Sequence, residues 1–162
     1  MQGAIAAAIG LGANLGDAPA TLASAVDELQ RLPRSTLTAV SPTYRSAPVD
    51  AVGPDFFNAV VLLDTHLAPL ELLAQLQRIE LAHGRQRGVR NAPRTLDLDL
   101  LLYGDRQLAL PELTVPHPRL HTRAFALRPL ADVWPEAVIP GRGPVMHWLP
   151  GVAEQRVERV TA

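Results

Sequence analysis

The stretch TLDLDLLLY, residues 95–103, alternates polar and apolar side chains more regularly than any other part of the chain. A period of two is typical of a β-strand. On such a strand Asp97 and Asp99 share one face. The other face is lined by leucines, at positions 96, 98, 100 and 102. The sequence therefore predicts a strand with one apolar face and two carboxylates on the opposite face.

Five further elements are predicted before this strand. In chain order they are a strand at 4–11, a helix from Asp17 to Pro33, strands at 35–43 and 56–63, and a helix from Pro69 to Gly84. Both helices are supported by leucines at helical spacing. The first begins at an aspartate, and the second begins at a proline and ends at a glycine. After the strand we expect a Pro-rich loop at 111–119, a helix at 122–134 interrupted by Pro129, and a short turn at 145–149.

The resulting order, β-α-β-β-α-β followed by a helical C-terminal part, is typical of one architecture. It predicts an α+β, ferredoxin-like fold, in which helices cover one face of an antiparallel sheet and the extra elements cover the other. The chain shows no linker or internal repeat, and its 162 residues suit one core. We therefore expect a single domain spanning residues 1–162.

Composition excludes several classes of function. With 15 basic and 16 acidic residues the net charge is −1, which lacks the basic footprint of a dedicated nucleic-acid binder. The absence of cysteine excludes disulfides and thiolate chemistry, and the absence of lysine excludes a Walker A lysine and Schiff bases. No apolar run reaches the ~18 residues of a membrane span, and no signal peptide is evident. We expect a cytoplasmic protein without nucleic-acid or membrane partners.

The two aspartates suggest a metal site. Strand rise places Asp97 and Asp99 roughly 6–7 Å apart, and like charges so close favour a cation between them. Hard carboxylate oxygens suit Mg²⁺, and such a pair can bridge two ions. A solvated strand face with two unrelated aspartates is the alternative.

Arginines gather just before this strand. Residues 78–94 contain five of them and one acid, Glu80. A basic loop beside paired carboxylates suits phosphoryl transfer, because guanidinium groups can take up phosphate charge. Further donors follow in Pro116-His117-Pro118-Arg119 and at Arg123. A merely solvated basic loop is again the alternative.

Other residues suggest a pocket for a flat heterocycle. Phe56 and Asn58 share one face of the strand at 56–63, so a ring could stack and hydrogen-bond there, although both phenylalanines of that strand could be core. Phe125 has the same ambiguity. The glycine-rich segment 10–16 lacks the spacing of a nucleotide loop and is expected to be a strand-to-helix turn that shapes a pocket wall.

Several segments resemble the 6-hydroxymethyl-7,8-dihydropterin pyrophosphokinase family of folate biosynthesis. They cover nearly the whole chain in order: residues 10–16, SPTYRSAPV at 41–49, PDFFNAV at 54–60, 77–87, PRTLDLDLL at 93–101 and LTVPHPRLHTRAFALRPL at 113–130. The resemblance implies transfer of diphosphate from ATP to a pterin alcohol, with release of AMP. It also implies two Mg²⁺ ions held by Asp97 and Asp99.

The same resemblance implies roles for individual residues. For the pterin, Asn58 would read the ring edge, Phe56 and Phe125 would enclose the ring, and backbone groups would come from Ser46, Ala47 and Val49. Three arginines, Arg85, Arg87 and Arg94, would act in catalysis at the ATP site. The remaining ATP-site residues would be Gln77, Glu80, Leu100, Thr114, His117 and Arg123.

This chain departs from some family members in three places. It has Arg90-Asn91-Ala92-Pro93 where some carry a longer loop with a Trp beside an Arg, Pro118 where some have Tyr, and Phe56 where Tyr is common. The role of Arg90 is left open. A regulatory ligand-binding module and a metal-dependent phosphohydrolase are the rival functions, and we expect a monomer.

Overall fold

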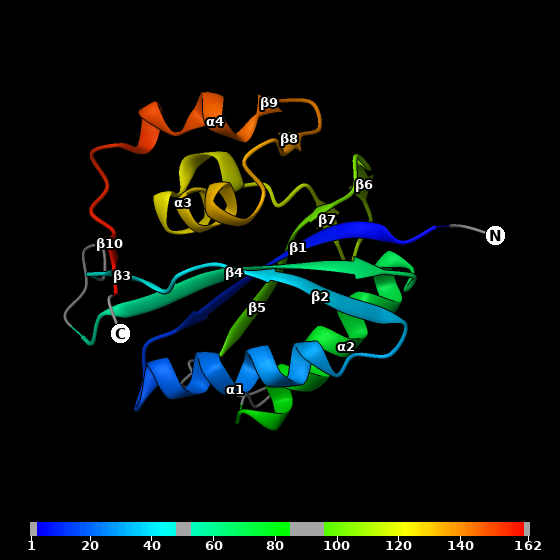
Figure 1. Cartoon of the computed structure of the whole chain (residues 1–162), viewed down its shortest axis with the longest axis horizontal. Helices are drawn as coiled ribbons and strands as arrows, with labels where there is room; N and C mark the ends of the chain where they lie inside the picture. Colours follow the sequence, from blue (N-terminus) through cyan, green and yellow to red (C-terminus); the bar gives the residue numbers. More distant parts are fainter. Residues whose placement is uncertain (1–2, 48–52, 85–95, 161–162) are drawn as a thin grey trace.

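The computed structural model describes residues 3–47, 53–84 and 96–160. It contains an antiparallel sheet with helices on both faces (Figure 1). The first half of the chain provides β1 (Ile5–Ala13), α1 (Ala18–Gln30), β2 (Ser35–Val40), β3 (Tyr44–Ser46), β4 (Phe56–Thr65) and α2 (Pro69–Ala82). The second half provides β5 (Asp97–Tyr103), β6 (Leu108–Ala109), β7 (Thr114–Val115), α3 (Ala124–Val133), β8 (Val138–Ile139), β9 (Gly143–Pro144), α4 (Val145–Trp148) and β10 (Glu158–Arg159).

The main sheet has the strand order β10-β3-β4-β1-β5, and β2 pairs with β4 beside β3. Every pairing in it is antiparallel. The sequence prediction of a mixed helix and antiparallel-sheet protein is therefore confirmed. Among the described residues, no helix has the length and apolar character that crossing a membrane requires.

Local signals set the ends of the two long helices. The Asp17 side chain accepts a hydrogen bond from the Ala20 amide at 3.2 Å, which caps α1. Glu71 Oε1 accepts from the Ala68 amide at 2.9 Å at the start of α2. Gly84 follows α2 with φ of +93°, a conformation that favours glycine and ends the helix as predicted.

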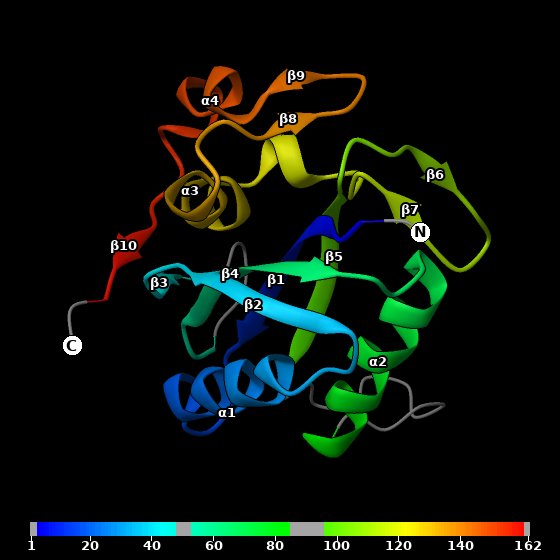
Figure 2. The ribbon, with the colours of Figure 1, turned by 45° about the vertical axis from the view of Figure 1, so that its right-hand side comes forward.

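The sheet separates two hydrophobic cores. One lies under α1 and α2 and includes Leu22, Leu76 and Leu98. The other lies under α3 and α4 and includes Val60, Leu101 and Leu127. Figure 2 shows the two helical layers on opposite faces of the strands.

Several details differ from the sequence predictions. β5 bulges where its register with β1 shifts, so Leu102 joins the core beneath α3 and not the core of Leu96, Leu98 and Leu100. β1 continues to Ala13, so Gly10 and Gly12 lie in a strand and not in a turn. The stretch 35–43 contains a strand only to Val40.

Helix α3 runs through Pro129 without interruption, because its other residues bury an apolar face against the sheet. The Pro-rich stretch 111–119 contains β7, which pairs with β6. No pattern in the sequence predicted β10, which has only two residues and pairs with the short β3.

Candidate active site

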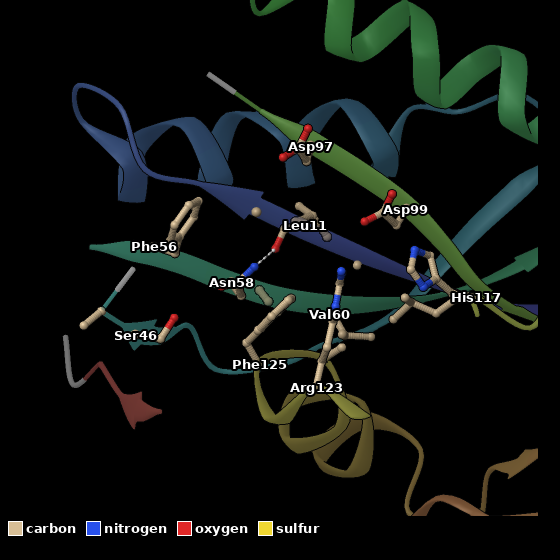
Figure 3. A pocket seen from close by; sticks show the side chains of 16 residues that line it. Leu11, Ser46, Phe56, Asn58, Val60, Asp97, Asp99, His117, Arg123 and Phe125 are labelled. Atoms are coloured by element: carbon tan, nitrogen blue, oxygen red, sulfur yellow. Dashed lines mark hydrogen bonds between the residues drawn. The ribbon is translucent and has the colours of Figure 1, made fainter. Parts of the chain in front are cut away.

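A cavity of about 370 Å³ lies between β4, β5 and the start of α3. Figure 3 shows side chains from all three elements pointing into it. One part of its wall is apolar and aromatic, and another part carries carboxylate, imidazole and guanidinium groups. Nine of the residues singled out from the sequence line it: Ser46, Ala47, Phe56, Asn58, Asp97, Asp99, His117, Arg123 and Phe125.

The two aspartates of β5 face this cavity together. In the register of the sheet, Asp97 lies opposite Gly12 and Asp99 lies opposite Gly10 on β1. Because glycine has no side chain, the neighbouring strand leaves space beside both carboxylates. The alternation predicted for residues 97–99 therefore holds, and the glycines of β1 complete it.

The amide of Asn58 is held in place from β1. Its Nδ2 donates a hydrogen bond to the carbonyl of Leu11 at 3.3 Å. A Cβ at Gly12 would lie only 2.8 Å from that nitrogen, so the amide packs directly over the glycine. An amide has two donors and a carbonyl acceptor, so a ligand edge in the cavity can still be bound by the remaining groups.

Two aromatic rings flank this amide. Phe56 is the first residue of β4 and is 38% exposed, an unusual environment for phenylalanine. Phe125 projects from the first turn of α3, and the Arg123 guanidinium carbon lies 5.3 Å from the centre of its ring. Figure 3 shows Phe56 and Phe125 on either side of Asn58. Such a set can stack on a flat ring and hydrogen-bond its edge.

His117 lies at the polar end of the cavity. Its Nδ1 accepts a hydrogen bond from the Arg119 amide at 3.2 Å, so the neutral ring carries its proton on Nε2. Burial of the ring lowers the pKa of His117. The negative charge of Asp99 raises that pKa, whereas the positive charges of Arg123 and Arg119 lower it. A neutral imidazole with an Nε2 donor can bind a phosphate oxygen.

Other predicted residues lie elsewhere. Thr114 lines a neighbouring cavity of about 600 Å³ that His117 also lines. The side chain of Leu100 is buried in the core beneath α1 and α2. Glu80 is buried there too, and its Oε2 accepts a hydrogen bond from the Leu98 amide at 2.9 Å. Glu80, Leu100 and Gln77 of α2 line neither cavity. Val49, Arg85, Arg87, Arg90 and Arg94 fall outside the described residues.

The structure adds lining residues that sequence reasoning missed. They are apolar or small and form the floor of the cavity: Leu11, Ala59, Val60, Leu101 and Ala126. Nothing distinguishes them from core residues in the sequence. The glycines at 10 and 12 did carry a signal, because their period of two matches that of the facing aspartates.

The donor set fits magnesium. Mg²⁺ is commonly held by one or two carboxylates together with substrate phosphates and water. Asp97 and Asp99 supply two carboxylates. Within the described ranges, no group of three or more His, Asp or Glu side chains could form an all-protein cage. Two carboxylates leave other coordination positions of Mg²⁺ to substrate phosphates and water.

Comparisons with known proteins agree with this chemistry. The family model for 7,8-dihydro-6-hydroxymethylpterin-pyrophosphokinase matches residues 8–135. The chain is 46% identical over 153 residues to the 2-amino-4-hydroxy-6-hydroxymethyldihydropteridine pyrophosphokinase of Pseudomonas aeruginosa, covering 94% of each chain. It is 43% identical over 126 residues to the enzyme of the same name from Bacillus subtilis, covering 77% of this chain and 75% of the relative.

A solved structure shares the fold. It is that of Plasmodium falciparum HPPK-DHPS, wild type with pteroate, which superposes with a TM-score of 0.76 at 13% identity. The match covers all of this chain and 47% of that longer one, so this chain spans about half its length. The family match and the bacterial relatives together show that the chain belongs to the 7,8-dihydro-6-hydroxymethylpterin-pyrophosphokinase family.

Proposed function

We propose that this cavity is where ATP transfers a diphosphate group to the hydroxyl of 6-hydroxymethyl-7,8-dihydropterin, in folate biosynthesis. One observation carries the proposal. An aromatic and amide surface suited to a flat ring shares a single cavity with paired carboxylates, an imidazole and a guanidinium suited to phosphate. A regulatory module would not need the second set, and a phosphohydrolase would not need the first.

The pterin would lie at the aromatic end. Phe56 and Phe125 would stack on its ring, and Asn58 would hydrogen-bond its edge. Ser46 and Ala47, at the end of β3, would offer backbone groups to the same ring, together with Val49. The anchoring of Asn58 by Leu11 supports this, because a fixed amide loses little freedom on binding.

The triphosphate would lie at the polar end. Asp97 and Asp99 would hold two Mg²⁺ ions, which neutralise phosphate charge when bound. His117 and Arg123 would donate hydrogen bonds to phosphate oxygens. Arg85, Arg87 and Arg94 would add positive charge, and Gln77 and Thr114 would supply further nucleotide contacts. Glu80 and Leu100, whose side chains are buried, would instead hold β5 from behind the two carboxylates. The neutral Nε2 donor of His117 and the place of Thr114 beside it support this arrangement.

Transfer requires the pterin oxygen to attack the β-phosphorus while the bond from that phosphorus to the α-phosphate oxygen breaks. The hydroxyl loses its proton to solvent, and AMP leaves. The contribution of the protein is to hold both substrates in line and to stabilise the phosphate charge. We assign no side chain as general base.

The fold is consistent with the proposed family function. The order β1-α1-β2-β4-α2-β5, with β1 and β4 central in the sheet, supports a ferredoxin-like core. The pairing of β10 with β3 supports a single domain that uses residues 1–162. We further propose a cytoplasmic monomer with ATP and a pterin alcohol as its partners.

Isothermal titration tests the two halves of the site separately. A non-hydrolysable ATP analogue should bind only weakly without Mg²⁺ and tightly with it, and pterin should then bind to the binary complex. Phe125→Ala should weaken the pterin step alone, and Asp99→Asn should weaken the magnesium-dependent nucleotide step. If Phe125→Ala leaves pterin affinity unchanged, the pterin does not occupy this cavity.

A further inference from the structure

Tyr44 is a buried residue that makes a partly exposed polar contact away from the cavity. Its side chain is 2% exposed, and its hydroxyl donates a hydrogen bond to the Asp132 carboxylate on the last turn of α3. Burial raises the pKa of the Tyr44 phenol, and the hydrogen bond to Asp132 raises it further. The phenol therefore stays protonated and can donate at neutral pH. Neither residue lines the cavity.

The contact belongs to the same seam between strand and helix as the pterin end of the cavity. Tyr44 and Ser46 are two residues apart on β3 and therefore project from the same face of the sheet. Phe125 and Asp132 are seven residues apart on α3, so they lie on one side of the helix, about 10 Å apart along its axis. Because β3 and α3 pack together, the cavity forms at one end of the seam and the hydrogen bond closes the other.

The C-terminal strand supports this contact from the outside. Arg159 of β10 pairs with Tyr44 in the sheet, and its Nη2 lies 3.4 Å from both the Tyr44 hydroxyl and Asp132 Oδ1. The guanidinium carbons of Arg159 and Arg128 lie 5.9 and 5.8 Å from the centre of the Tyr44 ring. β10 follows the segment that the family model matches, residues 8–135.

We propose that the Tyr44–Asp132 hydrogen bond positions the pterin-binding walls, by fixing the distance between Ser46 on β3 and Phe125 on α3. Tyr44 and Asp132 are thus positioning residues. They set the width of the pterin slot, the gap between Ser46 and Phe125, without touching a substrate. This inference rests on the proposed place of the pterin. It predicts an effect on pterin binding that is separate from ATP binding.

Tyr44→Phe is the direct test, because it removes the hydroxyl and keeps the ring beside its two arginines. We expect the Kd and KM for the pterin alcohol to rise by about three- to tenfold, the effect of one hydrogen bond. The KM for ATP and kcat should change by less than about twofold, since Asp97 and Asp99 lie on β5 and His117 follows β7, away from β3 and α3. Asp132→Asn keeps an acceptor and should raise the pterin Kd less than Asp132→Ala.

Tyr103→Phe is the matched control. Tyr103 is also buried, and its hydroxyl donates to the Leu67 carbonyl at 2.5 Å, but it lies at the far end of β5. It should lower the melting temperature as Tyr44→Phe does and leave pterin binding unchanged. Equal weakening of pterin binding in both variants, or equal weakening of ATP and pterin binding in Tyr44→Phe, would overturn the positioning role.

Phe125→Ala separates the two proposals. If it weakens pterin binding and Tyr44→Phe does not, the positioning role is wrong and the pterin site stands. If Phe125→Ala has no effect while Tyr44→Phe weakens pterin binding, the slot lies elsewhere along the seam, and both assignments fail.

Discussion

Gly12→Ala should damage pterin binding without unfolding the protein. Gly12 lies in extended strand β1, so alanine can adopt its backbone conformation. The new Cβ would lie 2.8 Å from Asn58 Nδ2, whereas ordinary van der Waals contact begins at 3.4 Å. The amide must therefore move away, and its 3.3 Å hydrogen bond to the Leu11 carbonyl breaks.

The expected magnitude follows from the groups left unpaired. If the displaced Asn58 no longer meets the pterin edge, binding loses about 1–3 kcal/mol, which is about a 5- to 150-fold rise in the pterin Kd. ATP binding should change by less than about twofold. Replacing glycine by alanine also restricts the unfolded chain by about 0.4–1 kcal/mol, so the melting temperature should not fall sharply.

Pterin titration of four variants decides this. Asn58→Ala should weaken pterin binding far more than ATP binding, and Gly12→Ala should have no further effect in the Asn58→Ala background, because the clash is gone. Gly151→Ala is the control, since Gly151 is exposed and its Cβ would meet nothing within 4 Å. Wild-type pterin affinity in Gly12→Ala, or additive losses in the double variant, would refute the reasoning.

Three further predictions concern the carboxylates, the aromatic rings and pH. Asp97→Asn or Asp99→Asn should lower turnover by several orders of magnitude at saturating Mg²⁺ while circular dichroism stays native, and near wild-type rates would remove the metal assignment. Phe56→Ala should raise the pterin KM and leave the ATP KM unchanged in steady-state assays; a parallel rise in both would point to a structural role. Burial lowers the pKa of both His117 and His121 below 6.5. The positive charge of Arg142 lowers the pKa of His121 further. The unfolded chain therefore binds more protons in acid, so the melting temperature should fall as pH drops from about 7 through 6.5, and His121→Asn should make that fall shallower. An unchanged slope in that variant would contradict the His121 contribution.

Patterns that depend on neighbours in sequence could be predicted. The alternation of β5, the caps of α1 and α2, and the shared face of Asp97 and Asp99 follow from local periodicity and propensity. The pairing of Gly10 and Gly12 with the aspartates depends on the register between strands far apart in the sequence, which a single sequence does not encode locally. The bulge in β5 is likewise defined by the register of β5 against β1.

The site residues likewise divide into those that local sequence could predict and those that depend on long-range packing. Phe56, Asn58 and Phe125 could be named from residue type and from resemblance, but their convergence comes from α3 packing on the sheet. The apolar floor of Val60 and Leu101 looks like ordinary core in the sequence. The Tyr44–Asp132 contact joins residues 88 positions apart and had no sequence signal.

Phosphorus NMR of the reaction products tests the central claim most directly. With ATP and Mg²⁺ alone, the purified protein should release essentially no AMP. Addition of 6-hydroxymethyl-7,8-dihydropterin should produce AMP and a pterin diphosphate in equal amounts, and Asp99→Asn should abolish both. AMP or ADP formed at the same rate without the pterin, or full product formation by Asp99→Asn, would contradict diphosphate transfer at this cavity.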